Sequence, residues 1–293
     1  AKGRGGKAEG RRQKAKDTVA PLSLAPSPTP PYPTLLATAL QHFNSGNGTE
    51  VERICREILA AQPDQVEAMN LLGVAYCQMG RLGEAMEQFQ QVVRSHPDFA
   101  DAWCNLGSTL RQQGKSLEAI AHYQKATELN SDLTDAHYNL ALVLQEQDRL
   151  EEALHHCQRA INTQPAMVDA HYTRGYVLRR LGRLQEAIES YRRTIQLSPN
   201  YPEAHKNLGH ALLLAGDLPN GFAEYEWRWR QKGWSPRSFS QPLWDGTPLE
   251  GRTILLHAEQ GMGDTLQFIR YAALVKQQGG VANELQGVTH ALF

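Results

Sequence analysis

The chain lacks the features that would tie it to a membrane, an oxidising compartment or nucleic acid. It has no run of about 18 apolar residues, so a membrane-spanning helix is excluded. Its four cysteines form no CxxC motif and have no regular spacing, which predicts free thiols in a reducing cytoplasm rather than a zinc knuckle or a disulfide framework. Lys and Arg number 30 against 31 Asp and Glu, so the basic excess of a dedicated nucleic-acid binder is missing.

Charge is nevertheless unevenly placed along the sequence. Residues 1–17 contain seven cations and two anions, a net charge of +5, whereas the remaining 276 residues carry −6. Residues 1–33 are rich in Lys, Arg, Gly, Ser and Pro and have little that a core would bury, so we expect a disordered tail. Its single Arg4-Gly5-Gly6 is compatible with RNA contact, and a solubilising or non-specific electrostatic tail is the alternative.

From residue 66 onward the sequence repeats with a period of 34 residues. Small residues recur at the eighth and twentieth positions, and mostly aromatic residues at the twenty-fourth. Small residues let two helices approach closely while large ones fill the space around the crossing. Glycine or aspartate at the fifteenth position and proline or serine near the end stop the helices. The pattern predicts two antiparallel helices per repeat, with repeats that start at Val66, Ala100, Thr134, Val168 and Pro202.

The five units run from residue 66 to about 235 without insertion and resemble the tetratricopeptide repeat family. A degenerate, capping first repeat precedes them at Leu35–Gln65. The resemblance implies an all-α solenoid of about six helix pairs over residues 34–235, whose first helices line a concave face. It also implies that the partner is a protein or an extended peptide bound on that face, and that neither a cofactor nor a metal ion is needed.

Asparagine occupies the sixth position of three of the five repeats, as Asn105, Asn139 and Asn207, and the other two repeats interrupt the row. An amide carries two donors and an acceptor, so such a row suits the backbone of an extended peptide. The runs at 102–107 and 136–141 resemble the repeats of O-linked N-acetylglucosamine transferases, in which an asparagine ladder holds substrate chains. The resemblance implies that these asparagines are exposed peptide-binding residues; the alternative is solvated polar residues beside the core.

Histidine recurs at the fourth position, as His137, His171 and His205. Equivalent side chains in adjacent repeats are roughly 8–10 Å apart for each helix packing step, whereas zinc ligands lie about 2 Å from the ion. The pattern therefore predicts packing in place of an aromatic residue, not a metal site. The neighbouring residues 155–157, His-His-Cys, point in different directions on a helix and predict a structural cluster.

The amino-acid composition changes after residue 216, and four tryptophans fall within residues 227–244. Tyr225 and Trp229 are spaced as neighbours on one helical face, which favours a last repeat helix docked against a following domain; an exposed stacking site is the alternative. Residues 236–293 are interpreted as a linker followed by a strand at Thr253–Ala258, a glycine-rich turn and a helix at Thr265–Gln278. We expect this unit to be the incomplete start of an α/β domain, and the resemblance described next implies that the domain is Rossmann-like.

Residues 225–265 resemble the junction in bacterial repeat proteins whose C-terminal half is a two-Rossmann-domain glycosyltransferase. That resemblance implies Asp264 as a candidate general base, and helix N-capping is the alternative role. Only 58 residues follow residue 235, whereas two α/β domains need roughly 100–200 residues each, so we expect this chain alone to be inactive. The hypothesis is a cytoplasmic peptide-binding scaffold of a glycosyltransferase-like protein. The alternative is a protein O-glycosyltransferase that uses a UDP-sugar in its full-length form.

Overall fold

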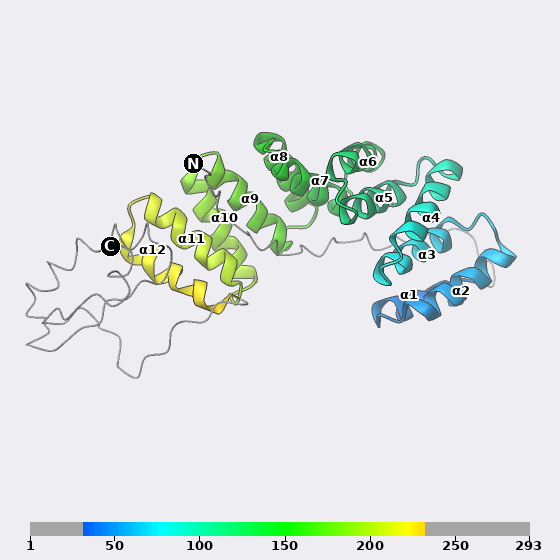
Figure 1. Ribbon diagram of the computed structural model, residues 1–293. Coiled ribbons are helices and arrows are strands. Elements are labelled where there is room, and N and C mark those ends of the chain that lie inside the picture. Colours follow the sequence, from blue (N-terminus) through cyan, green and yellow to red (C-terminus); the bar gives the residue numbers. More distant parts are fainter. Residues whose placement is uncertain (1–31, 232–293) are drawn as a thin grey trace, which may run out of the picture. The chain divides into compact units, whose positions relative to one another are not determined.

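The computed structural model describes residues 32–231, and this part of the chain contains helices and no strand (Figure 1). Its helices follow one another in chain order as six pairs, which confirms the all-α repeat array predicted from the sequence. The predicted tail, the linker, the strand at Thr253–Ala258 and Asp264 lie outside the described residues. The pairs are α1 (Pro33–Asn44) and α2 (Gly48–Ala61), α3 (Val66–Gln78) and α4 (Leu82–Ser95), α5 (Ala100–Gln112) and α6 (Ser116–Leu129), α7 (Thr134–Glu146) and α8 (Leu150–Thr163), α9 (Val168–Arg180) and α10 (Leu184–Leu197), and α11 (Pro202–Leu214) and α12 (Leu218–Tyr225).

A residue with left-handed backbone joins the two helices of each pair. Gly80 has a φ of 75°, and Asp148 takes a φ of 62° at the position where the other repeats have glycine. The next residue then donates its N–H to a carbonyl five residues earlier, as Arg81 N does to Tyr76 O at 2.9 Å. This geometry satisfies a carbonyl that the helix end leaves unpaired, and it confirms the turn predicted at the fifteenth position.

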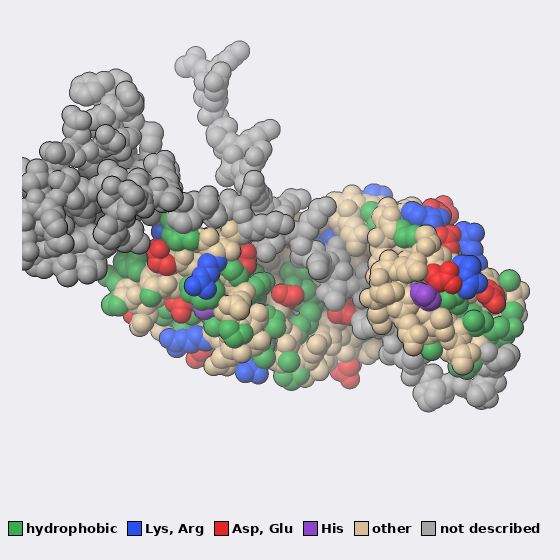
Figure 2. Space-filling view, turned by 90° about the horizontal axis from the view of Figure 1, so that it is seen from below, with side chains coloured by type: hydrophobic (Ala, Val, Ile, Leu, Met, Phe, Trp, Pro, Cys, Tyr) green, Lys and Arg blue, Asp and Glu red, His purple; other side chains and the backbone are tan. Residues whose placement is uncertain are grey.

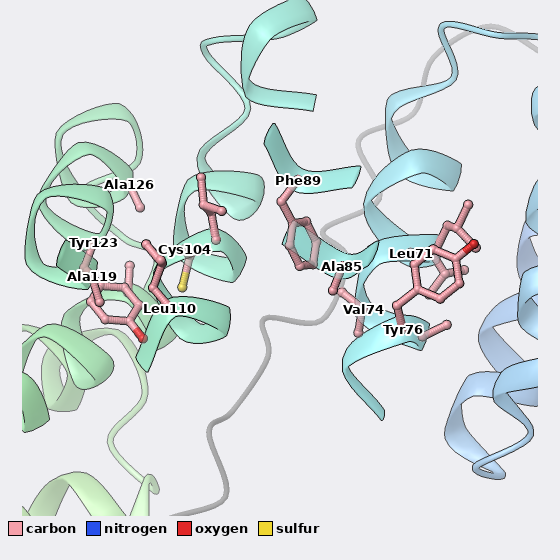
Figure 3. Packing of buried hydrophobic residues seen from close by; sticks show 14 of the residues in the cluster. Leu71, Val74, Tyr76, Ala85, Phe89, Cys104, Leu110, Ala119, Tyr123 and Ala126 are labelled. Carbon is pink, nitrogen blue, oxygen red and sulfur yellow. The ribbon is translucent and has the colours of Figure 1, made fainter. Parts of the chain in front are cut away.

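The small eighth position of each repeat lies against the twenty-fourth. A Cβ atom on Gly107 would lie 2.8 Å from the Tyr123 ring, and one on Gly73 would lie 2.6 Å from Phe89. Figure 3 shows these two rings packed between helices, each close to an alanine of its own helix. Both rings are fully buried, so the missing side chain at the eighth position is what lets the helices cross this closely.

Stacking of the pairs follows one rule along the array. Each second helix contacts the first helix of the next pair, and consecutive first helices also contact one another. The first-helix face, defined here as the surface formed by α3, α5, α7, α9 and α11, therefore joins neighbouring repeats directly. None of the helices in residues 32–231 is both long and apolar enough to cross a membrane.

The last pair ends differently from the others. α12 stops at Tyr225 and a 3₁₀ helix, η1 (Glu226–Arg230), follows, so the predicted helical pairing of Tyr225 with Trp229 is wrong. Arg228 instead lies over both rings, 4.5 Å from each centroid. Arg228 thus makes a cation–π contact with each of the two rings.

Candidate functional site

The three asparagines predicted to be exposed are buried on the first-helix face, which corrects that expectation. Asn105, Asn139 and Asn207 are 1%, 0% and 8% exposed. Each sixth position faces the preceding repeat, so neighbouring first helices cover it from one side. The alternative that they are solvated polar residues is also wrong.

Each of these asparagines donates a hydrogen bond to the preceding repeat. Asn105 Nδ2 donates to Asn70 Oδ1 at 3.0 Å, and Asn207 Nδ2 donates to the Tyr172 hydroxyl at 2.8 Å. Asn139 Nδ2 donates to Ser108 Oγ at 3.2 Å, and that oxygen also accepts from Tyr123. The amides therefore fix the register between consecutive first helices, a role that the sequence analysis did not foresee.

On α3 and α5, three polar atoms are buried without a hydrogen-bond partner among residues 32–231. They are the Oδ1 atoms of Asp101 and Asn105 and the Nδ2 atom of Asn70. Asp101 and Asn105 stand four residues apart on α5 and so share one side of that helix. A buried polar atom without a partner costs about 1–3 kcal/mol, so this cluster is suited to groups that would satisfy it.

A row of carboxylates occupies the second position of each of the five repeats. The sequence analysis did not identify this row. It lies in the first turn of each first helix and consists of Glu67, Asp101, Asp135, Asp169 and Glu203. Their recurrence at the 34-residue period is visible in the sequence and would have identified them. Four of them, all but Glu203, form no ion pair with any residue that the structure describes.

Burial raises the pKa values of two carboxylates in the row. The pKa of Asp101 lies above its ordinary range because the group is desolvated. Desolvation, and then the negative charge of Asp101, raise the pKa of Asp135 to about 6. The second cause indicates that carboxylates of adjacent repeats lie close enough to repel each other.

The charged form of Asp135 destabilises the fold by more than its position in the helix stabilises it. A negative charge in the first turn of a helix gains about 0.3–1 kcal/mol from the helix dipole. The pKa of Asp135, raised to about 6, corresponds to about 3 kcal/mol of unfavourable interaction with its charged form at neutral pH. Helix stabilisation therefore does not explain Asp135, and groups held at such a cost are typical of functional sites.

Tyrosines lie beside the carboxylate row, and burial and then the negative charge of the row raise their pKa values. Desolvation followed by the charge of Glu203 raises the pKa of Tyr172 to about 12. The pKa values of Tyr138 and Tyr201 are also raised, first by burial and then by Asp169. The Tyr201 hydroxyl donates to Asp169 Oδ1 at 3.3 Å. Two carboxylates of the row, Asp169 and Glu203, thus impose a negative potential on neighbouring aromatic side chains.

The recurring histidines pack as predicted and also bind backbone. The Nε2 atoms of His137, His171 and His205 each lie 3.0 Å from the carbonyl oxygen six residues earlier. In the second of the five repeats, Trp103 makes the same bond with its Nε1 to Pro97 O at 2.9 Å. A ring N–H at the fourth position therefore anchors the first helix of four of the five repeats to the turn before it, which explains why histidine replaces an aromatic residue here.

No metal-binding cluster of His, Cys, Asp or Glu is present within residues 32–231. His137 and His156 lie 3.0 Å apart through their Nδ1 atoms, and because Nε2 of His137 donates to a carbonyl, the Nδ1–H of His156 is the donor. Desolvation and then the charge of His137 lower the pKa of His156 to about 4. The four cysteines are thiols rather than disulfides, and Cys157 is buried.

Charges on the face shown in Figure 2 are mixed, with acidic and basic side chains interspersed. On the second helices, glutamates pair with an arginine three residues earlier: Arg149 donates to both carboxylate oxygens of Glu152 at 2.7 and 2.6 Å. Arg183 does the same with Glu186 at 2.7 and 2.8 Å. These two glutamates are neutralised locally, whereas Asp101, Asp135 and Asp169 form no ion pair with any residue that the structure describes.

Comparison with known protein families identifies the array. Models described as "TPR repeat" match residues 73–114, 107–148 and 175–216, and models described as "Tetratricopeptide repeat" match residues 37–93 and 134–166. Together these matches cover more than half of the 293 residues. The chain belongs to the tetratricopeptide repeat family. The match over residues 37–93 includes the degenerate first repeat, and the matched residues end at 216.

Solved structures agree with this tetratricopeptide repeat fold. A crystal structure of MamA is 24% identical, with a TM-score of 0.51, over 54% of this chain and 93% of that one. PilF of Pseudomonas aeruginosa is 16% identical, with a TM-score of 0.62, over 67% of this chain and 90% of that one. MamA (41-end) from Desulfovibrio magneticus RS-1 is 19% identical, with a TM-score of 0.52, over 57% and 97%. Identities this low establish the fold alone, and no curated protein matches the chain.

Proposed function

We propose that this tetratricopeptide repeat protein is an interaction scaffold that binds an extended segment of a partner protein along its first-helix face. The observation that carries the proposal is the carboxylate row, which recurs in five consecutive repeats; its member Asp101 and the nearby Asn105 each have a buried oxygen without a partner. One element per repeat at regular spacing suits an extended chain better than a compact ligand. The concave side predicted from the sequence is the face we propose.

Asn105 has a side-chain atom that its inter-repeat bond does not use. Its Nδ2 donates to Asn70, while its buried Oδ1 has no partner and could accept from a peptide N–H. Asn139 and Asn207 hold the equivalent position in their repeats, so we propose that the same peptide passes along them. A peptide bound here would supply N–H donors in register with the repeats.

A site-specific cross-linking experiment tests the face. Tyr176, which is half-buried on α9, is replaced in the full chain by p-benzoylphenylalanine, and the control variant carries that residue at Gln158, which is exposed on α8. A peptide selected from a random display library for binding to the full chain is then irradiated with each variant. We expect cross-links from position 176 and not from position 158. Cross-linking from position 158 alone would refute binding on the first-helix face.

We further propose that the array is the recognition part of a glycosyltransferase-like protein in the cytoplasm. Support comes from the resemblance of residues 225–265 to such junctions and, for the compartment, from the four free cysteines. In this proposal Asp264 is the base and a UDP-sugar is the donor only in a longer form of the protein. Calorimetry of this chain with UDP-N-acetylglucosamine should show no tight binding. Micromolar affinity, or transfer activity lost in Asp264→Asn, would favour an active transferase.

A further inference from the structure

The basic N-terminal segment and the array carry opposite charges of similar size. Residues 1–17 have a net charge of +5, while residues 32–231 contain 18 Lys and Arg against 24 Asp and Glu, a net charge of −6. We propose that residues 1–17 bind in cis to the carboxylate row of the first-helix face and so compete with partners for it. This inference rests on the proposed function of that face, because it names a competitor for the same surface.

The first helices present carboxylates in consecutive repeats that have no cation beside them. Some glutamates of the second helices, such as Glu152 and Glu186, are instead held by an arginine of their own helix pair, whereas Glu87, Glu118 and Glu189 are scattered and exposed to solvent. Asp101, Asp135 and Asp169 have no ion pair with any residue between 32 and 231. A basic chain therefore gains most by lying along these three carboxylates, which stand in consecutive repeats.

The unpartnered polar atoms of the face match the groups that a basic segment offers. Asp101 Oδ1 and Asn105 Oδ1 are acceptors, and they suit Lys and Arg side chains and backbone N–H groups, which are donors. Asn70 Nδ2 is a donor and suits a backbone carbonyl. Charge-assisted hydrogen bonds to a buried carboxylate are among the stronger ones, so Asp101 should anchor the segment. Raised pKa values at Asp101 and Asp135 agree with carboxylates that lack a cation beside them.

Chain length permits the contact without strain. Residues 18–32 carry no charged side chain, and five of the fifteen are proline, so they separate the basic segment from the start of α1. At about 3.1 Å per residue in a polyproline conformation they span up to roughly 45 Å. Consecutive first helices in contact are about 8–10 Å apart, so α5, α7 and α9 lie within that reach. Tethering at this distance raises the effective concentration of the segment to about the millimolar range.

Competition between the tethered segment and an added copy tests the proposal. A fluorescein-labelled synthetic peptide of residues 1–17 is titrated at low salt with the full chain and with a tail-neutral full chain, and binding is read by fluorescence anisotropy. In the tail-neutral chain all seven cations of the segment are replaced by glutamine: Lys2, Arg4, Lys7, Arg11, Arg12, Lys14 and Lys16. We expect the peptide to bind the tail-neutral chain about tenfold more tightly than the wild-type chain, since the competitor in cis is gone.

Two further variants of the tail-neutral chain locate the contact. Asp101→Asn, Asp135→Asn and Asp169→Asn together should weaken peptide binding about tenfold or more. The matched control removes the same charge from exposed positions on second helices, with Glu87→Gln, Glu118→Gln and Glu189→Gln, and should change affinity less than about twofold. Circular dichroism and thermal unfolding confirm that each variant is folded.

Three outcomes would overturn the inference. They are equal peptide binding by the wild-type and tail-neutral chains, an equal loss in the control variant, and no peptide binding at all. In the last case, cross-linking of an unrelated library peptide from position 176 would leave the proposed function standing. Loss of both binding and cross-linking would refute the face itself.

Discussion

Alanine at Gly107 tests how tightly the two helices of a repeat are packed. Its Cβ would lie 2.8 and 2.9 Å from Cε1 and Cδ1 of Tyr123, and that ring is fully buried with its hydroxyl bonded to Ser108. Because the ring has no room to retreat, overpacking should cost about 1–3 kcal/mol. Alanine regains roughly 0.8–1 kcal/mol of helix propensity over glycine, so the net change is a loss of about 1 kcal/mol.

Gly83 provides the matched control for this substitution. It lies on α4, has normal helical φ, and a Cβ there would meet nothing within 4 Å. Gly83→Ala should therefore stabilise the chain by about 0.5–1 kcal/mol through propensity alone. Urea unfolding of the full chain, followed by far-ultraviolet circular dichroism, compares the two variants. Gly107→Ala should be about 1–3 kcal/mol less stable than Gly83→Ala.

The third of the five repeats suggests a rescue of the Gly107 variant. Here Ala141 replaces the glycine and Cys157 replaces the aromatic residue, so the extra methyl group faces a small side chain. In a Tyr123→Cys background, Gly107→Ala should become neutral or stabilising, which corresponds to a coupling energy of about 1–3 kcal/mol. If Gly107→Ala stabilises the wild-type chain as much as Gly83→Ala does, or costs the same in both backgrounds, the packing argument is refuted.

Three other predictions concern the first helices. Because the folded pKa of Asp135 is raised to about 6, its contribution to stability is complete below the unfolded pKa of about 4 and is lost as pH rises through 6. The Asp135→Asn chain should therefore gain up to about 2–3 kcal/mol over wild type between acidic and neutral pH, as urea unfolding would show; a constant difference contradicts this. His171→Phe removes the bond to Pro165 O and should cost about 1 kcal/mol, whereas His171→Trp, which mimics Trp103, should cost less in the same assay. Replacing Asn105, Asn139 and Asn207 together by alanine should lower the melting temperature by several degrees. An unchanged melting temperature would show that their inter-repeat hydrogen bonds contribute nothing to stability.

The repeat architecture could be predicted from the sequence because local signals agree with one another at a fixed period. Each of these signals concerns contacts within one helix pair: the small residue at the eighth position, the turn at the fifteenth and the closing proline. Even Asp148, which breaks the glycine pattern, keeps the left-handed backbone, and its Oδ1 accepts from Arg180 at 2.9 Å. Each rule concerns residues fewer than about 20 apart, where sequence patterns are informative.

Burial of the asparagines could not be predicted in the same way. Their partners Asn70, Ser108 and Tyr172 belong to the preceding repeat, lie 31 to 35 residues earlier, and are three different residue types. No single residue pattern at the sixth position therefore predicts these partners. The prediction for the end of the last pair was wrong for a related reason. It inferred a shared helical face from the spacing of Tyr225 and Trp229, which assumes that the regular helix continues, whereas α12 ends at Tyr225.

In the proposed function, the sixth position serves both the fold and recognition, whereas the second position serves recognition alone. Asn105 donates Nδ2 to the preceding repeat, and its Oδ1 is the atom proposed to meet a ligand, so a substitution there would disturb packing together with any binding. The carboxylate of Asp101 makes no bond to a neighbouring repeat, and burial makes its charged form unfavourable for folding. Asp101→Asn keeps the shape while removing that charge, so lost binding without lost stability would have to come from recognition. The carboxylate row is therefore the part of this face where function can be measured independently of the fold.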